Sequence, residues 1–250
     1  MISRKTFYST LILCLGLVSP CAADEARFLA LLQKSVASYE KVKDYTAIFH
    51  KTETDEGKTG PEEIIFLKFE KPFKIFMGWL NTKKKGLQVL YERGRHDGKL
   101  VIHKPGLLLG LAPVIFLDQN SPWVKEGSAT YDIEDAGIGT FLKDFDRAVT
   151  AAKKQEKLTV TALQKTDAGE EFGVTFEDSA KDPVYFAYRI KVLFDAHNHL
   201  PVRMELFDWE NQPTGIYFYD NLLLNVGSDD PEFKKQINRR LAKAYAVPDR

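Results

Sequence analysis

The residues best suited to chemistry in this 250-residue sequence form one short cluster of Asp195, His197 and His199. Two imidazoles spaced two residues apart beside a carboxylate could bind a metal ion or act as an acid–base pair. The cluster lies between two strand-like stretches, where the chain has to turn, and Asp, Asn and His tolerate the tight backbone of turns. We therefore interpret it as a turn, without a metal, a cofactor or a catalytic residue. A pocket in which the three side chains converge would favour the alternative.

The first 23 residues are typical of a secretory signal peptide. Arg4 and Lys5 precede the short apolar stretch Leu11–Val18, and the small residues Cys21-Ala22-Ala23 precede Asp24. We predict export to the periplasm, cleavage after Ala23 and a single domain over residues 24–250. No transmembrane segment is expected, because a span needs roughly 20 apolar residues. A lipoprotein anchored at Cys21 is the alternative.

The rest of the sequence lacks the usual signatures of catalysis. His50, His96 and His103 are isolated along the chain, and no phosphate-binding loop, dinucleotide fingerprint or nucleophile elbow occurs. Both cysteines, Cys14 and Cys21, lie in the predicted leader, so its removal leaves no thiol for a disulfide, a nucleophile or a metal. The formal net charge is zero, whereas nucleic-acid binders usually carry a basic surplus, so we expect no nucleic-acid partner.

Strand-like alternation organises residues 45–80. Apolar runs there have large side chains at odd positions, and this period of two indicates β-strands rather than helices. Gly57, Gly60 and Pro61 separate the first two runs, and Lys71-Pro72 separates the last two. Even positions are partly apolar too, which predicts that the second face of the sheet is also partly covered. The odd apolar positions are Tyr45, Ala47, Phe49, Ile65, Leu67, Phe69, Phe73, Ile75, Met77 and Trp79.

The remaining chain predicts a mostly β fold with flanking helices, of the α+β class. Helical spacing of apolar residues predicts amphipathic helices over 24–42 and 133–154, and a polar helix over 231–244. About ten strands result, and hairpin signals such as Asp97-Gly98 predict that they pair antiparallel. Beyond residue 80, the predicted strands cover residues 86–92, 99–104, 158–165, 171–177, 184–195, 200–209 and 215–226.

The run Leu107–Leu117 has no charged residue and does not alternate. Its eleven residues are too few to span a bilayer. One interpretation is a buried loop or short helix. The other is an apolar lid at the mouth of a cavity, or a segment that touches a membrane.

Four stretches along the chain carry a family pattern: YTAIFHKTE, FLKFEKPFKIFMGW, RHDGKLVIHKPG and HLPVRMELFDWENQPTGIYFYDNLLLN. Together they resemble the LolA/LolB-like superfamily of periplasmic lipoprotein carriers, and within it an uncharacterised branch defined only as a domain of unknown function. The resemblance covers most of the chain after the leader. It implies an unclosed, strongly curved antiparallel β-barrel, with helices plugging the open side and a hydrophobic cavity between sheet and helices.

The resemblance and the two partly apolar faces lead to one functional expectation and two alternatives. We expect a non-catalytic carrier or chaperone whose cavity binds lipid acyl chains or a lipidated partner protein. The alternatives are an envelope sensor or assembly module that binds another envelope protein, and a small-molecule enzyme on the same fold. The candidate cavity residues are Phe49, Leu67, Phe69, Ile75, Met77 and Trp79 on one sheet face, and Leu107, Leu108, Leu111 and Phe116 at the mouth.

Overall fold

The computed structural model describes residues 20–55, 57–105, 114–125, 133–177, 182–227 and 237. Within them the chain forms twelve strands. These are β1 (Asp44–Asp55), β2 (Lys58–Thr59), β3 (Glu63–Glu70), β4 (Lys74–Trp79), β5 (Gln88–Glu92), β6 (Leu100–His103), β7 (Val114–Leu117), β8 (Leu158–Thr166), β9 (Gly169–Phe176), β10 (Arg189–Asp195), β11 (Pro201–Phe207) and β12 (Pro213–Leu224).

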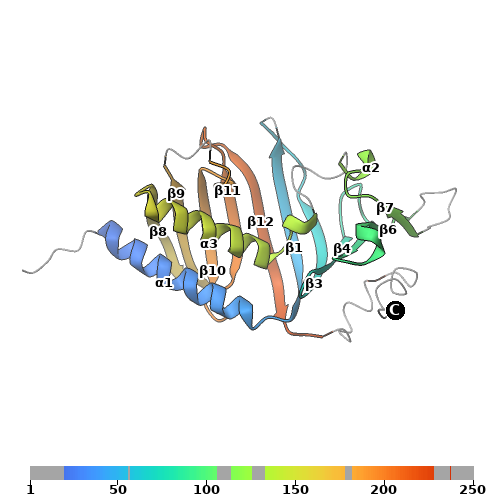
Figure 1. Ribbon diagram of the computed structural model, residues 1–250, viewed down its shortest axis with the longest axis horizontal. Coiled ribbons are helices and arrows are strands. Elements are labelled where there is room, and N and C mark those ends of the chain that lie inside the picture. Colours follow the sequence, from blue (N-terminus) through green and yellow to red (C-terminus); the bar gives the residue numbers. More distant parts are fainter. Residues whose placement is uncertain are drawn as a thin grey trace, which may run out of the picture.

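The strands form one curved antiparallel sheet (Figure 1). Their order is β7-β6-β5-β4-β3-β1-β12-β11-β10-β9-β8, and β2 pairs with β1 beside this path. The two longest strands, β1 and β12, pair at its centre, where Phe49 lies opposite Tyr219. The end strands β7 and β8 are not neighbours in this order, so the barrel is unclosed. This confirms the predicted fold class.

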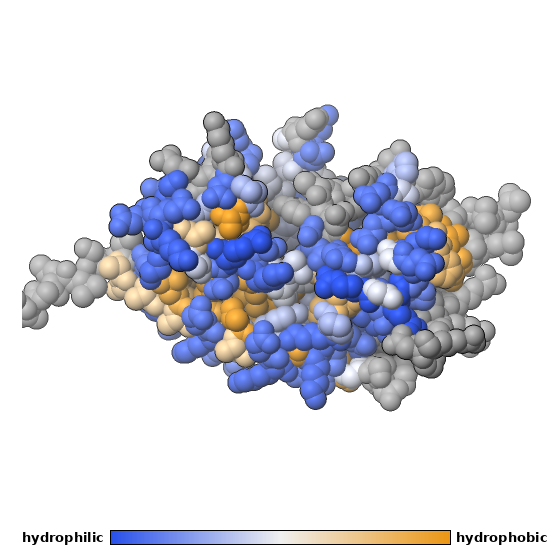
Figure 2. Space-filling model, viewed as in Figure 1, coloured by the Kyte–Doolittle hydropathy of each residue, from blue (hydrophilic) through white to orange (hydrophobic). Residues whose placement is uncertain are grey.

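Two long helices cover one half of the sheet. They are α1 (Pro20–Glu40) and α3 (Ile138–Lys154), and both lie across β8–β11 (Figure 1). The buried residues of α3 recur at helical spacing from Ile138 to Ala152, and its outward side is mostly hydrophilic (Figure 2). The other half of the sheet faces shorter elements, α2 (Pro122–Lys125) and the 3₁₀ turn η2 (Ile133–Asp135), and a further 3₁₀ turn, η1 (His96–Gly98), connects β5 to β6.

The first turn of α3 is fitted closely against two tyrosines. The hydroxyl of Tyr45 accepts a hydrogen bond from the Ile138 N–H at 3.1 Å. A Cβ atom at Gly139 would overlap the hydroxyl and ring carbons of Tyr39, which belongs to α1. Gly137, just before the helix, has φ of 103°, a value that favours glycine. The glycines near residue 138 therefore let α3 begin in contact with α1 and the sheet.

Each face of the sheet has its own apolar cluster. The odd-numbered apolar residues of β3 and β4 belong to the main core or pack against it, as the alternation predicts. On the opposite face Phe66, Phe76, Leu90 and Val101 form a second buried cluster. Ile237, from near the C-terminus, packs against that second cluster. The second face is thus partly covered, as predicted.

Several predicted boundaries differ from the structure. Two strands were not predicted: β2 and β7. The strand predicted from Val184 begins at Arg189, because the side chain and backbone oxygens of Asp182 accept hydrogen bonds from Val184 and Tyr185 and form a turn there. The helix predicted over 133–154 is divided into η2 and α3 at Gly137. The predicted helix 231–244 lies outside the described residues, except for Ile237.

Candidate functional site

A cavity of about 870 Å³ lies beside the start of α3, mainly against the half of the sheet that α1 and α3 leave uncovered, and it reaches Met204 and Leu206 of β11. Its floor is built from strand residues on the same face as the main core, because alternate side chains of each strand point to that face. The apolar residues of this floor are Phe49 on β1, Ile65 on β3, Met77 and Trp79 on β4, Val89 on β5, Leu100 and Ile102 on β6, Ile115 and Leu117 on β7, Met204 and Leu206 on β11, and Tyr217 and Tyr219 on β12.

The opposite wall comes from the short elements and the start of α3. Val124 of α2, Ile133 of η2 and Phe141 of α3 supply its larger apolar side chains. Asp135, Thr140 and Asp144 add polar groups at this wall. The cavity is therefore a partly open space between a β floor and a helical cover, with apolar side chains on both sides.

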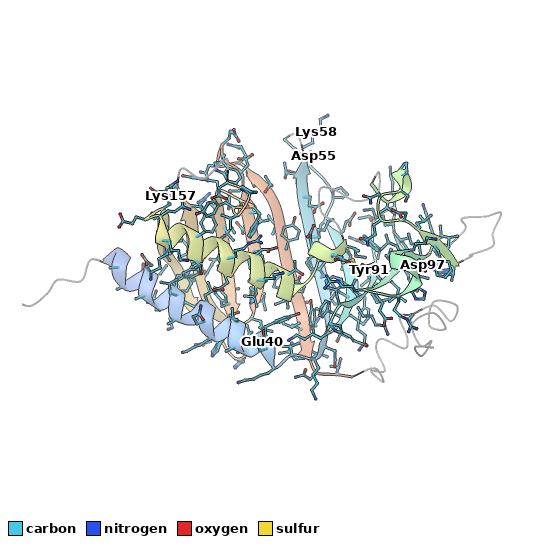
Figure 3. The ribbon with its side chains drawn as sticks, viewed as in Figure 1. Glu40, Asp55, Lys58, Tyr91, Asp97 and Lys157 are labelled. Atoms are coloured by element: carbon cyan, nitrogen blue, oxygen red, sulfur yellow. The ribbon has the colours of Figure 1, made fainter. Side chains whose placement is uncertain are left out.

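Glu134 holds η2 against the sheet. Its carboxylate accepts hydrogen bonds from the hydroxyl of Tyr91, labelled in Figure 3, and from Arg93 at 3.0 Å. The hydrogen bond from Tyr91 contributes most to lowering the pKa of Glu134. Partial burial raises this pKa, and Arg93 lowers it further. Burial and the Glu134 carboxylate raise the pKa of Tyr91. Glu134 thus favours its charged form and ties η2, on one side of the cavity, to Tyr91 of β5.

Glu63 holds Trp79 in place at the end of β4, whereas Tyr91 pairs with Ile75 near the start of that strand. Glu63 accepts hydrogen bonds from the Trp79 indole N–H at 2.9 Å and forms an ion pair with Lys84 at 2.6 Å. Burial alone would raise the pKa of Glu63, but the hydrogen bonds from Lys84 and Trp79 and the charges of Lys84 and Lys51 outweigh it and hold the pKa below its ordinary value. The indole is consequently held as a rigid part of the cavity wall.

The structure divides the six predicted cavity residues of the sheet into two groups. Phe49, Met77 and Trp79 lie on the cavity wall. Leu67, Phe69 and Ile75 share their sheet face but lie in filled core, at 0%, 4% and 0% exposure, and not on the wall. The reason is position along the strands: Phe69, for example, lies near the ends of β3 and β1, where its ring stacks on Tyr45 at 5.3 Å.

The predicted mouth is only partly within the described residues. Leu107, Leu108 and Leu111 lie outside them. Residues 114–117 form β7, paired with β6, and not the loop or short helix that the uncharged run suggested. Because strand residues alternate, Ile115 and Leu117 line the cavity while Phe116 points to the other face, 52% exposed and 5.7 Å from the His96 ring. Phe116 therefore does not lie on the cavity wall.

Sequence reasoning missed the wall residues of β5–β7 and β11–β12. The signal was present in part, since Val89, Leu100 and Ile102 belong to short apolar runs that predict strands. It gave no reason to group them with β1 and β4. Among the polar wall residues, Lys84 belongs to the charged run Lys83-Lys84-Lys85, whereas Lys51, Glu53 and Lys104 carried no recognisable signal.

The Asp195 cluster is a turn, as predicted. One carboxylate oxygen of Asp195 accepts hydrogen bonds from the backbone N–H groups of His197 and Asn198, both at 2.9 Å. His199 adopts a positive φ of 62°. Asp195, His197 and His199 are not on the cavity wall. Within the described residues, no group of three or more His, Cys, Asp or Glu side chains is arranged to hold a metal ion.

No helix within the described ranges has both the length and the apolar character needed to cross a membrane.

Comparisons with solved structures give similarities of fold at low sequence identity. A LolA superfamily protein from Nitrosomonas europaea is 10% identical, with 85% of this chain and 98% of that chain covered and a TM-score of 0.37. Lipoprotein LppX from Mycobacterium tuberculosis is 9% identical, with 81% of this chain and 100% of that chain covered and a TM-score of 0.44. The matching chain in the MucA/MucB complex from Pseudomonas aeruginosa is 11% identical, with 84% of this chain and 60% of that chain covered and a TM-score of 0.43.

No curated protein matches the chain. The sequence pattern of one family, described as "Protein of unknown function (DUF1571)", matches residues 42–240. This range includes every strand described above and α3. The chain therefore belongs to the DUF1571 family of proteins of unknown function, the kind of uncharacterised branch that its motifs predicted.

Proposed function

We propose that this protein is a non-catalytic binding protein of the cell envelope, whose cavity holds the acyl part of a lipid or of a lipidated partner protein. The observation that carries the proposal is the partly open, mainly apolar cavity of about 870 Å³. Protein interiors contain few voids larger than a water molecule, so a space of this size is not a packing defect. The cavity volume falls within the range of roughly 300–1,000 Å³ that is typical of small-molecule sites.

The chemistry of the wall favours an acyl ligand. Its floor presents apolar side chains, among them Phe49, Met77, Ile102 and Ile115. Moving an alkyl chain from water into such a space contributes about 0.8 kcal/mol for each buried CH₂ group. Transfer from one membrane or protein to another needs no bond to be made or broken, so this binding energy is sufficient for a carrier.

The charged groups of the wall support a non-catalytic function. Glu53 forms an ion pair with Lys51 at 3.0 Å and accepts a hydrogen bond from Tyr217 at 3.2 Å. Behind the wall residue Trp79, burial opposes the ionisation of Glu63, but hydrogen bonds from Lys84 and Trp79 lower its pKa. A general acid works best with a pKa near the working pH, and a carboxylate with a lowered pKa is far from that condition.

For location, we propose export to the periplasm with cleavage after Ala23, giving a domain of residues 24–250. Asp24 supports this boundary. Its carboxylate accepts a hydrogen bond from the Ala162 N–H of β8 at 3.0 Å and pairs with Arg27 at 3.3 Å. The first residue after the proposed cleavage site thus already has a fixed place in the fold. The intact mass of the exported protein distinguishes this form from a lipoprotein anchored at Cys21.

The test uses two neighbouring residues of β7 that point to opposite faces. Ile115→Glu places a charge inside the cavity, whereas Phe116→Glu places it on the exposed face. Delipidated proteins are titrated with a fluorescent long-chain acyl probe, supplied both as the free acid and as its methyl ester. We expect saturable binding by the wild type and by Phe116→Glu, and a loss of affinity of at least about tenfold in Ile115→Glu.

Circular dichroism and thermal unfolding of all three proteins establish that the variants are folded. Absence of saturable binding of both the acid and the ester by the folded wild type contradicts the proposal. The same conclusion follows if the two glutamate variants lose affinity equally. A module that binds an envelope protein partner would then be the better explanation.

A further inference from the structure

One end of the cavity is rich in charge. Lys51 and Glu53 of β1 line it, as do Lys84, in the loop before β5, and Lys104, just after β6. The loop and the end of β6 are adjacent, because a Cβ atom at Gly86 would lie 3.0 Å from Pro105 Cγ. Gln88, at the start of β5, pairs with His103, at the end of β6. Lys84 and Lys104 therefore lie at the same end of the sheet.

The carboxylates around the cavity are all engaged. Glu53 is held by Lys51 and Tyr217, and Glu63, behind Trp79, is held by Lys84 and the indole. On the helical wall, Asp144 pairs with Arg147 at 3.1 Å, and Asp135 has a polar or electrostatic interaction of its own. The charges of Glu53, Glu63 and Asp144 are thus each paired with a cation of the protein itself.

Lys104 differs from the other cavity lysines. Lys51 and Lys84 each pair with a glutamate, at 3.0 Å and 2.6 Å. Lys104 has no ion-pair partner among the described residues, although its side chain is exposed and contributes to the cavity wall. At this end the three lysines face two glutamates, Glu53 and Glu63, so one positive charge is left over, and it is that of Lys104.

We propose that the ligand is an anionic amphiphile, a single alkyl or acyl chain in the cavity with a carboxylate or phosphate head bound by Lys104. This inference rests on the proposed function and narrows its ligand class. An uncharged head would leave the Lys104 ammonium without a counter-charge, and a cationic head would be repelled by it. An anionic head forms an ion pair at the cavity rim while its chain occupies the apolar part, without disturbing the Lys51–Glu53 and Lys84–Glu63 pairs.

The test compares heads of different charge on one chain. Delipidated wild-type protein is titrated with a fluorescent long-chain fatty acid, a monoalkyl phosphate of the same chain, and the methyl ester of the fatty acid. Because an exposed ion pair is worth little, we expect the anionic probes to bind about three- to fivefold more tightly than the ester. This preference should shrink at high salt, since surface charges are screened.

Matched variants assign the preference to one residue. Lys104→Glu should remove or reverse it, while Lys104→Arg should keep it. Lys85→Glu is the control, because it makes the same charge change at an exposed residue of the loop that holds Lys84, next to the end of β6, and Lys85 is not on the cavity wall. We expect Lys85→Glu to keep the preference within about twofold, because screening weakens a charge outside the wall.

The outcomes separate this inference from the proposed function. Equal affinity of the wild type for the acid, the phosphate and the ester overturns the anionic ligand but leaves acyl binding intact. Loss of the preference in Lys85→Glu as well as in Lys104→Glu overturns the assignment to Lys104. A response to the phosphate alone, or to the acid alone, identifies which of the two anionic heads the site prefers. Failure of all three probes to bind overturns both proposals.

Discussion

The two halves of the sheet present similar apolar faces but meet different covers. Over β8–β11, the ring of Phe28 from α1 lies 5.8 Å from Phe145 of α3, 5.5 Å from Phe172 and 6.4 Å from Phe194, and all four are buried. Over β4–β7, the same face borders a cavity of about 870 Å³. Long amphipathic helices supply enough side-chain volume to fill the first half, whereas η2 and α2 do not fill the second.

The comparison separates two roles for apolar residues that look alike in the sequence. In the covered half they hold the fold together, because each has neighbours on every side. In the cavity half they keep a space open for something else. Variants that change one half and leave the other intact test whether this division is real.

The largest expected difference comes from truncating one side chain in each half. Phe28→Ala removes a ring that contacts three buried rings, and loss of such a core phenylalanine costs about 3–5 kcal/mol. Met77→Ala, at the cavity wall, removes fewer contacts, so we expect a loss of about 1–2 kcal/mol. Urea unfolding of the delipidated proteins measures both free energies. Equal losses would show that the cavity half is packed as a core.

A smaller effect is expected where the two cover helices meet. Gly139→Ala introduces a Cβ atom that overlaps Tyr39, so we expect overpacking to cost about 1–3 kcal/mol. Combining it with Tyr39→Leu removes the ring that causes the overlap. The double variant should therefore lose less than the sum of the two single losses in thermal unfolding. Strict additivity would mean that the helices can separate without cost, and that the covered half is looser than its contacts indicate.

The smallest expected effect is on the pH dependence of stability. The pKa of Glu63 lies below its ordinary 4.5, so the folded protein binds this proton less readily than the unfolded chain. Its contribution is complete above the unfolded pKa and is lost as the pH falls below it toward the folded pKa. We expect Glu63→Gln to remove about 1 kcal/mol or less at neutral pH and to flatten the stability curve in acid.

Glu205, in the covered half, is the matched control. Burial opposes its ionisation, but hydrogen bonds from Lys191 and Arg203 lower its pKa, so Glu205→Gln should flatten the acid limb in the same way. The two variants should differ in ligand binding. Glu63→Gln weakens the support of Trp79 on the cavity wall, and Glu205 has no such link. Unfolding curves from about pH 3 to about pH 7, with acyl-probe titrations at neutral pH, test both points. An equal effect of both variants on binding would contradict the division.

The sequence by itself determined much of the architecture. The period of two across residues 45–80 required strands, and the helical spacing of the α3 residues required an amphipathic helix, because each pattern buries apolar groups in one geometry. The turn at Asp195 followed from its residue types, since an Asp carboxylate can accept the N–H groups of the next residues. These are local relations that a reader of the chain can see.

Only the tertiary structure decided which apolar residues form core and which form cavity. Leu67 and Met77 have the same alternation and the same sheet face, and they even pair across β3 and β4, yet Met77 lies on the cavity wall and Leu67 does not. Likewise, residues 114–117 become a strand through pairing with β6, which no feature of the uncharged run indicates. Periodicity assigns a side chain to a face, but what fills the space opposite depends on elements far away in the chain, and here on where α1 ends and α3 begins.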